Sequence, residues 1–299
     1  MPKRPARKVV KGADVLYHYL QKSLQDEDVW LFQMLVAKLV TALGIWFPPS
    51  GYGVLPIALP HVVRDPDCRG LGPKDQWSSP NAHGYVRDDN SLVKGLVGSF
   101  SVKSPNFSEY RNRKLGGGFV SAHAWRTTSD GGYAARQAPT NSFWPNLVWL
   151  PTNVAKLTDR EGSFAQTFVQ ALSTKIYRDA EVSAPLRSFA DEAWALLPEV
   201  PEFPEQGLPD TADLNFFEVP TSFFQTRLKT IRIASAGLRC VEEGRPLQGK
   251  VLHTRYTAGL VNVEPEAARL LRLRLDKYAD GVEGAIGDLS NGSAGESGS

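Results

Sequence analysis

The chain has 299 residues, of which 42% are hydrophobic and 22% charged, and its net charge at pH 7 is +2. These values are typical of a folded globular protein, and the seven tryptophans exclude a disordered chain. The near-neutral charge does not by itself indicate a class of partner. Two widely spaced cysteines, Cys68 and Cys240, exclude a four-cysteine zinc site and argue against a disulfide scaffold. We therefore expect a reducing, cytoplasmic compartment.

The first residues are basic, but no apolar signal core follows them directly, so we expect no secretory signal. Residues 29–47 (VWLFQMLVAKLVTALGIWF) are apolar enough to suggest a membrane span. Gln33 and Lys38 lie near the centre of this segment, and a lysine at mid-membrane costs roughly 3 kcal/mol. We therefore predict no membrane contact but a buried core helix, or a helix that binds a second copy of the chain or another protein.

The chain divides into four regions by composition. Residues 1–90 are predicted to form a helical and loop-rich region, with helices at 12–24 and 27–45 followed by a long Gly/Pro-rich loop. Residues 91–180 contain short β-rich runs (LVGSFSV, GGFVSAHAW, NLVWL) and then a helical run from Gly162 to Ala180. Residues 181–285 are predicted to be a helical, basic region, and residues 286–299 a flexible tail.

Within the third region, we expect a helix at 184–197. The acidic, proline-rich stretch 198–219 cannot be a continuous helix, and we interpret it as a boundary. Beyond it the chain carries seven basic residues between 227 and 255, and an amphipathic helix is predicted at 264–279. These basic residues could form a second contact surface for DNA.

Residues 116–159 carry the pattern that is most informative about function. A histidine, His123, ends an apolar strand, and a Gly/Thr/Ser-rich loop leads to a second strand that begins at Asn146. Pro151 then turns the chain into a helix. Phosphodiester hydrolysis needs a base that activates water and a divalent cation that stabilises the leaving oxygen. A histidine, with an ordinary pKa of roughly 6.5, is a suitable base at neutral pH.

The segment NLVWLPTNVAKLTD resembles the second half of HNH (ββα-metal) nucleases, in which such a strand leads into a short helix bearing Asn or His and then Lys. AHAW stands where that family has its strand-end histidine, and the 23-residue spacing from His123 to Asn146 falls in the family's range. The resemblance implies that His123 is the general base and that Asn146 orients it or locks the loop. It further implies Asn153 as a metal ligand, and Lys156 or Arg126 as phosphate contacts.

The sequence departs from the family at two positions. Ala122 precedes the histidine, where many members have an acidic metal ligand. Asn153 comes seven residues after Asn146, whereas the last ligand often comes eight or nine after it. Because the fold has variants with a single asparagine ligand, the resemblance implies a site that relies on water ligands, which suits Mg²⁺ (or Mn²⁺). Asp159 or Asp130 would then supply the remaining protein ligand of the metal site.

Purely structural roles remain open for these residues. A histidine on an apolar strand is often a hydrogen-bonded core residue, Asn146 could simply cap a turn, and Asn153 could be a helix N-cap. The acidic run 87–95 (RDDNSLVKG) is interpreted as a structured loop, because no matching E-x-K strand accompanies it. The basic run just before the histidine strand contributes three candidate contacts to nucleic acid, namely Arg111, Arg113 and Lys114.

We therefore predict an α+β protein with a central ββα-metal core, flanked by helical N- and C-terminal regions. Its expected function is that of a metal-dependent endonuclease acting on DNA, and a role in restriction or phage defence would fit. Two alternatives remain. One is a DNA-binding protein of the same fold without catalysis, which Ala122 would permit. The other is a subunit of a larger assembly that docks through residues 29–47 and whose nuclease activity its partners control.

Overall fold

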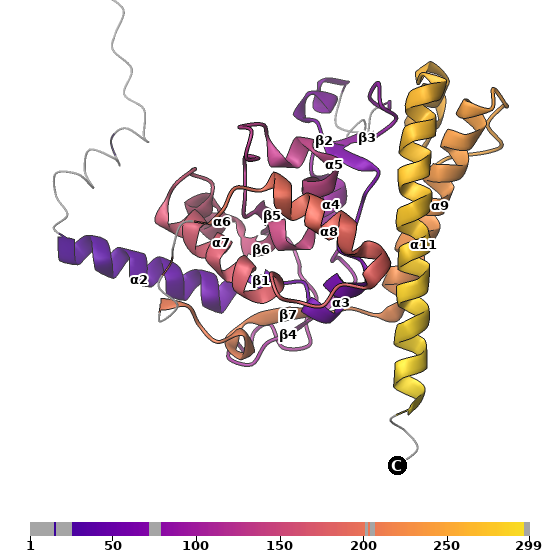
Figure 1. Ribbon diagram of the computed structural model, residues 1–299. Coiled ribbons are helices and arrows are strands. Elements are labelled where there is room, and N and C mark those ends of the chain that lie inside the picture. Colours follow the sequence, from indigo (N-terminus) through magenta and orange to yellow (C-terminus); the bar gives the residue numbers. More distant parts are fainter. Residues whose placement is uncertain (1–14, 16–25, 72–78, 201–202, 204–206, 296–299) are drawn as a thin grey trace, which may run out of the picture.

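The protein is a mixed α+β structure. The computed structural model describes residue 15 and residues 26–71, 79–200, 203 and 207–295 (Figure 1). The helix expected at 12–24 lies outside these ranges except for Val15. The ten helices in the described ranges are α2 (Asp26–Leu43), α3 (Pro49–Val54), α4 (Ser91–Gly95), α5 (Ala138–Asn141), α6 (Thr152–Thr158), α7 (Phe164–Tyr177), α8 (Ala184–Leu196), α9 (Thr221–Glu242), α10 (Thr254–Gly259) and α11 (Pro265–Gly295).

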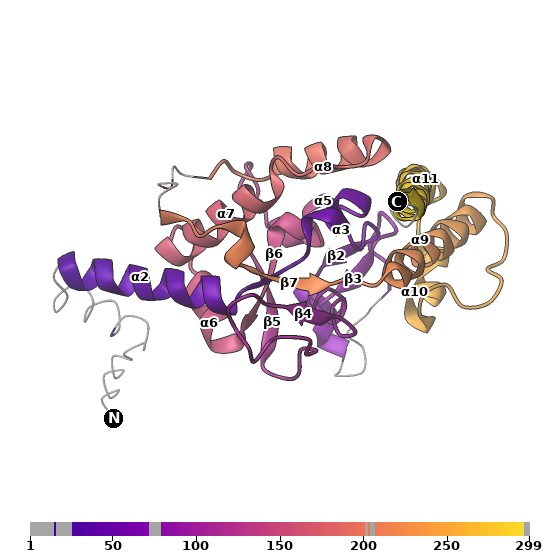
Figure 2. The same ribbon diagram turned by 90° about the horizontal axis from the view of Figure 1, so that it is seen from below.

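A five-stranded sheet in the order β4-β7-β1-β6-β5 lies at the centre (Figure 2). Its strands are β1 (Ile45–Trp46), β4 (Ser101–Lys103), β5 (Phe119–His123), β6 (Leu147–Pro151) and β7 (Asn215–Glu218). The β1–β7 pair is parallel and the other pairs are antiparallel. β7 comes from the acidic stretch 198–219, so the sheet joins strands from three of the regions expected from composition.

A separate two-stranded sheet lies beside the first. β2 (Val62–Arg64) pairs in parallel with β3 (Val86–Asp88). Both strands belong to the region 1–90, where a long Gly/Pro-rich loop was predicted after the N-terminal helices. Asn141, at the end of α5, donates its side-chain amide to the Val62 carbonyl at 3.1 Å. This bond ties the small sheet to the loop that follows β5.

The core is built from aromatic side chains. The rings of Phe47 and Trp144 stack with centroids 3.6 Å apart, and both residues are fully buried. Tyr177 of α7 donates its hydroxyl to the Phe47 carbonyl at 2.6 Å, which fixes α7 against the end of β1. Tyr278 of α11 donates to the Ile57 carbonyl at 2.8 Å. Helices distant in sequence are therefore anchored on the same segment, residues 47–57.

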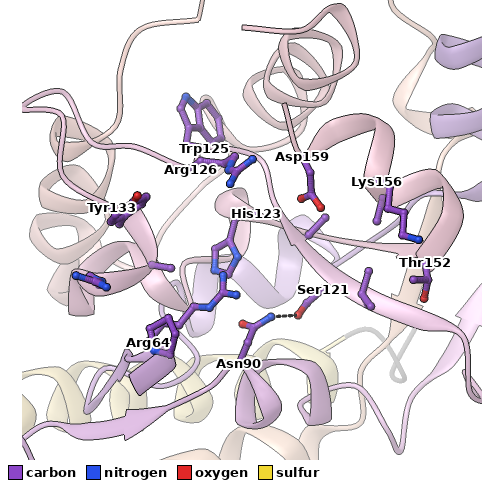
Figure 3. A pocket seen from close by; sticks show the side chains of 16 residues that line it. Arg64, Asn90, Ser121, His123, Trp125, Arg126, Tyr133, Thr152, Lys156 and Asp159 are labelled. Atoms are coloured by element: carbon purple, nitrogen blue, oxygen red, sulfur yellow. Dashed lines mark hydrogen bonds between the residues drawn. The ribbon is translucent and has the colours of Figure 1, made fainter. Parts of the chain in front are cut away.

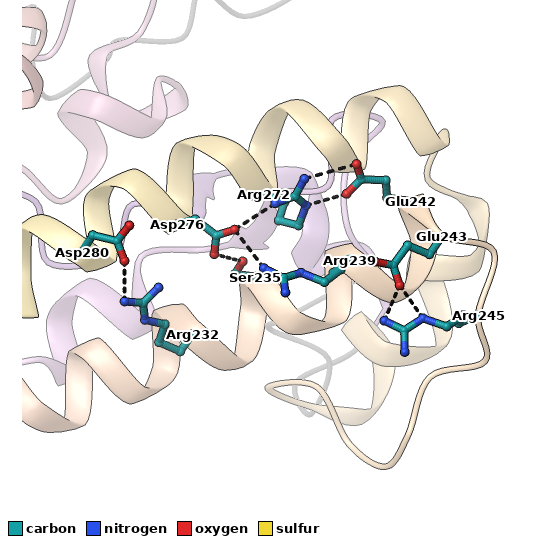
Figure 4. Close-up of polar contacts among 9 residues, drawn as sticks. All are labelled: Arg232, Ser235, Arg239, Glu242, Glu243, Arg245, Arg272, Asp276 and Asp280. Atoms are coloured by element: carbon teal, nitrogen blue, oxygen red, sulfur yellow. Dashed lines mark hydrogen bonds and ion pairs between the residues drawn. The ribbon is translucent and has the colours of Figure 1, made fainter.

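α9 and α11 form a long helix pair at one side of the molecule (Figure 1). Arginines of both helices form ion pairs with carboxylates, among them Arg232, one of the basic residues between 227 and 255 (Figure 4). Arg232 pairs with Asp280 at 2.6 Å, and Arg272 pairs with Asp276 at 2.9 Å. Their charges are therefore partly neutralised within the helix pair.

α11 also extends beyond the expected end of the C-terminal helix. It continues to Gly295, through most of the tail predicted to be flexible from residue 286. Val282 and Ala285 are still buried, so the helix is supported almost to the point where that tail was expected to start. Adding residues to an existing helix costs far less than nucleating a new one.

α2 projects from the body of the protein (Figure 1). Val36 and Val40 are buried against the core, but seven large apolar side chains are exposed, namely Val29, Trp30, Leu31, Phe32, Met34, Leu35 and Leu39. The buried-helix prediction is therefore met only on one face of α2. Among the described residues, no helix is both long enough and apolar enough to span a membrane.

Candidate functional site

β5, β6 and α6 follow one another in the strand, loop, strand, helix order expected from residues 116–159. β5 and β6 pair antiparallel from Phe119↔Pro151 to His123↔Leu147. α6 begins immediately after β6 and packs on both strands. His123 therefore lies at the end of β5, at the start of the loop that leads back to β6.

A cavity of about 550 Å³ opens beside this unit (Figure 3). α6 contributes three side chains to its wall, namely Thr152, Ala155 and Lys156, and Asp159 follows directly after the helix. Ala155 and Lys156 come three and four residues after Thr152, and Asp159 comes four and three residues after them, so the four side chains lie on one face of this segment. The opposite wall comes from β2 and from the turn after β3, through Arg64 and Asn90.

His123 is held in the cavity by its neighbour Asn141. Nε2 of His123 lies 3.1 Å from the Asn141 carbonyl oxygen. Because a carbonyl can only accept, Nε2 must carry the proton, and Nδ1 of the neutral ring keeps its lone pair. Burial, aided by the nearby positive charge of Arg64, lowers the pKa of His123 to about 4. The ring is therefore neutral at pH 7.

Asn146 locks the loop that begins at His123. Its Oδ1 accepts the backbone N–H of Trp125 at 2.7 Å, and its Nδ2 donates to the Thr140 carbonyl at 3.0 Å. The side chain is fully buried and does not line the cavity. Of the two roles that the sequence left open for Asn146, the geometry therefore corresponds to the structural one.

The structure separates the residues expected to bind a metal. Asp159 lines the cavity, whereas Asn153 is exposed on another face of α6 and does not. Asp130 accepts from Thr128 and from the Gly132 backbone, so it stabilises a turn of the loop. Within the described ranges, no group of three or more His, Cys, Asp or Glu side chains is placed to hold a metal ion.

Of the candidate phosphate contacts, some line the cavity and others lie far from it. Arg126 and Lys156 both line the cavity. Arg111, Arg113 and Lys114 are exposed beside β4, which is at the opposite edge of the sheet from β5. Arg111 also donates to the Pro105 carbonyl at 3.2 Å. Proximity in sequence to the histidine strand therefore does not bring this basic run to the cavity.

Several cavity residues were missed by sequence reasoning. Arg64 and Asn90 come from elements far from His123 in sequence, and tertiary contacts bring them near it: Asn141 bonds to Val62 of β2, and Asn90 bonds to Ser121 of β5. Arg136 and Tyr133 belong to the loop between β5 and β6, and the Arg136 guanidinium lies 5.2 Å from the Tyr133 ring centroid. A basic residue in a loop carries no local signal, so these positions could not have been selected from the pattern.

The acidic run 87–95 has a structural role. Asp88 is buried, and its carboxylate accepts from the backbone of Asn90 and Leu92 and from the Ser91 hydroxyl. These bonds close the first turn of α4. The structured-loop interpretation of this run is consistent with this geometry.

The charges in the cavity are unbalanced. Among the residues that the structure describes, it is lined by one carboxylate, that of Asp159, and by four cationic side chains, namely Arg64, Arg126, Arg136 and Lys156. An excess of positive charge around a neutral histidine suits an anionic ligand.

Comparison of the chain with protein-family models, with curated proteins and with solved structures finds no match.

Proposed function

We propose that the chain is a metal-dependent endonuclease that hydrolyses phosphodiester bonds of DNA, with His123 as its general base. The observation that carries the proposal is the hydrogen bond from His123 to the Asn141 carbonyl, inside a cavity of excess positive charge. This bond fixes the tautomer that a base requires. The cationic wall suits the phosphate that the base would serve.

The cavity residues have distinct roles in this reaction. Nδ1 of His123 takes a proton from water as the water oxygen bonds to phosphorus. The Asn141 carbonyl holds the ring in place and stabilises the imidazolium that forms. Arg126 and Lys156 bind the non-bridging oxygens of the phosphate. As the opposite P–O bond breaks, the leaving oxygen departs with its electron pair and is protonated by solvent.

The residues present fit Mg²⁺ better than a metal that requires many protein ligands. Mg²⁺ keeps several waters and binds through one or two carboxylates together with substrate phosphate. Asp159 supplies one carboxylate at the cavity wall. When bound, the ion would stabilise the negative charge that develops on the leaving oxygen.

The test is cleavage of supercoiled plasmid DNA with Mg²⁺ or Mn²⁺ by the wild type and by His123→Ala. We expect the wild type to nick or linearise the plasmid, EDTA to stop cleavage, and the variant to be inactive while still folded. His83→Ala, which changes an exposed histidine, is the matched control and should cut like the wild type. If the wild type binds DNA but cuts none, modified or unmodified, a non-catalytic DNA-binding protein replaces the nuclease.

The exposed apolar surface of α2 favours a second proposal, contact with a second copy of this chain. Leu31 and Leu35 flank Gln33 symmetrically and are 53% and 59% exposed. Asp28 and Lys38 also flank Gln33 symmetrically and lie on the same helix face. An antiparallel pair of α2 helices would therefore place leucine against leucine and Asp28 opposite Lys38.

A further inference from the structure

Arg64, at the end of β2, contributes an unusual group to the cavity. Its Nε is buried, and no hydrogen-bond partner for it exists among the described residues. Guanidinium nitrogens are obligate donors, so a buried one without an acceptor is costly unless a ligand supplies the acceptor. The group lines the cavity beside His123 (Figure 3).

A second buried atom without a partner lies on the same wall. Asn90 donates its amide to the Ser121 hydroxyl at 3.2 Å, but its Oδ1 is buried and accepts no hydrogen bond within the described part of the chain. Asn90 also adopts a φ of 92°, a conformation that residues other than glycine rarely take. Residues in uncommon backbone conformations are concentrated at ligand sites, and a buried polar atom without a partner calls for an explanation such as a bound ligand or water.

The position of Arg64 relative to His123 is set by one residue. Asn141 accepts from His123 through its backbone carbonyl and donates through its side chain to Val62, two residues before Arg64. The base and the strand that carries Arg64 are therefore held to the same buried anchor. This arrangement restricts movement of β2 away from the histidine.

We propose that Arg64 also binds the phosphate of the substrate beside His123, by donating from its guanidinium to a non-bridging oxygen. This inference rests on the proposed function. It assigns the β2–β3 sheet as the second wall of the phosphate site, opposite α6. Arg126 and Lys156 hold the same group from the loop and helix side.

Phosphate binding at Arg64 also changes the strength of the base. In the free protein, burial and Arg64 hold the pKa of His123 down at about 4, which is low for a base at neutral pH. The other charged or titratable side chains on the cavity wall are Arg126, Tyr133, Arg136, Lys156 and Asp159. An anion bound to Arg64 offsets the positive charge and raises the pKa of His123, so that the base becomes stronger when substrate is present.

The first experiment measures binding of a labelled DNA duplex in EDTA, where no metal-dependent cleavage occurs. The variants are Arg64→Gln, Arg64→Lys and, as control, Arg232→Gln, whose arginine is paired with carboxylates on α11 outside the cavity. We expect Arg64→Gln to weaken binding roughly ten- to a hundredfold. Arg64→Lys should recover part of the loss, and the control should bind like the wild type. Wild-type affinity in Arg64→Gln would overturn the proposal.

The second experiment follows the His123 ring by NMR as pH is varied, with and without the duplex. We expect the pKa of His123 to rise on DNA binding in the wild type. In Arg64→Gln it should already be higher in the free protein and change less. If the wild type cuts DNA and Arg64→Gln cuts and binds DNA equally well, the role of Arg64 is refuted and the proposed nuclease activity stands. If the wild type never cuts DNA but Arg64→Gln binds it more weakly than the wild type does, the nuclease is refuted and the phosphate site remains.

Discussion

The side chain of Asn146 holds the backbone of Trp125 in place, because its Oδ1 accepts the Trp125 N–H at 2.7 Å. Trp125 comes two residues after His123, so this bond fixes the loop where it leaves the base. On its other side, Nδ2 donates to Thr140, next to the Asn141 carbonyl that binds the histidine. One buried amide therefore holds both sides of the base.

Replacing Asn146 should destabilise the protein as well as the site. Asn146→Ala leaves the Trp125 N–H and the Thr140 carbonyl without their partner, and we expect a loss of roughly 2 to 4 kcal/mol in the free energy of unfolding. Urea denaturation at neutral pH measures this loss. Asn153→Ala, at an exposed position on α6, is the control and should change stability little. Equal stability of the two variants would contradict the role assigned to Asn146.

The stability of the protein should fall in acid partly because of His123. Its folded pKa of about 4 lies below the ordinary 6.5, so the unfolded chain binds the proton more tightly. The contribution of the neutral His123 ring to the free energy of unfolding is complete above about pH 6.5 and is lost as pH falls toward 4. This contribution is on the order of 3 kcal/mol. We expect His123→Gln to lose less stability than the wild type between these pH values.

Denaturant titrations at several pH values measure that difference. His61, also buried, has a pKa lowered to about 3 by burial and by the positive charge of Arg227, so part of the acid sensitivity should persist in the variant. His83→Gln, at an exposed site, should follow the wild type. If His123→Gln and the wild type lose the same free energy from neutral pH to pH 4, the ring is not held neutral by its surroundings.

The two candidate metal ligands should respond differently to mutation. We expect Asp159→Asn to reduce Mg²⁺-dependent cleavage roughly 10- to 100-fold, with partial recovery at high Mg²⁺, because it removes the carboxylate at the cavity wall. Asn153→Ala should stay within about twofold of the wild type. Cleavage rates measured over a range of Mg²⁺ concentrations distinguish the two. If Asn153→Ala were inactive and Asp159→Asn active, Asn153 rather than Asp159 would be the metal ligand.

Only basic residues of the cavity should contribute to the salt dependence of DNA binding. Each phosphate contact adds about 0.9 to the slope of log affinity against log salt concentration for duplex DNA. We expect Lys156→Gln and Arg126→Gln each to reduce that slope by about this amount. Arg113→Gln, beside β4 and outside the cavity, should leave it unchanged. The opposite pattern would move the DNA surface to the β4 edge.

The sequence predicted those parts of the site that are built from residues consecutive in the chain. His123, the loop, β6 and α6 are consecutive, so apolar runs and turn residues were enough to place the histidine at a strand end. Asn153 was selected as a ligand, yet the cavity face is formed by Thr152, Ala155 and Lys156 of α6 and by Asp159 just after it. One residue along a helix turns the side chain by about 100°, and a motif match does not show which face points inward.

The other wall of the site depends on contacts that no local pattern reveals. Arg64 reaches His123 only because β2 pairs with β3 and Asn141 ties β2 to the loop. β7 was hidden in an acidic, proline-rich stretch because a four-residue strand between strands of other regions needs no long apolar run of its own. The arginines Arg232 and Arg239 of α9 appeared to be a basic surface because their carboxylate partners on α11 lie more than 30 positions away in the sequence, as with Arg232 and Asp280.

The exposed stripe of α2 gives the last prediction, a concentration-dependent dimer that Leu35→Asp disrupts. Leu35 is 59% exposed in the single chain, so the substitution should barely change the unfolding of the monomer but should place a charge in the leucine contact. Light scattering coupled to size exclusion measures the mass of each form. Leu270→Asp, at a comparably exposed leucine of α11 (56%), should still dimerise. Val40→Asp, at a fully buried site of α2, should instead destabilise the fold. A wild type that stays monomeric at high concentration would exclude a second copy as the occupant of this surface.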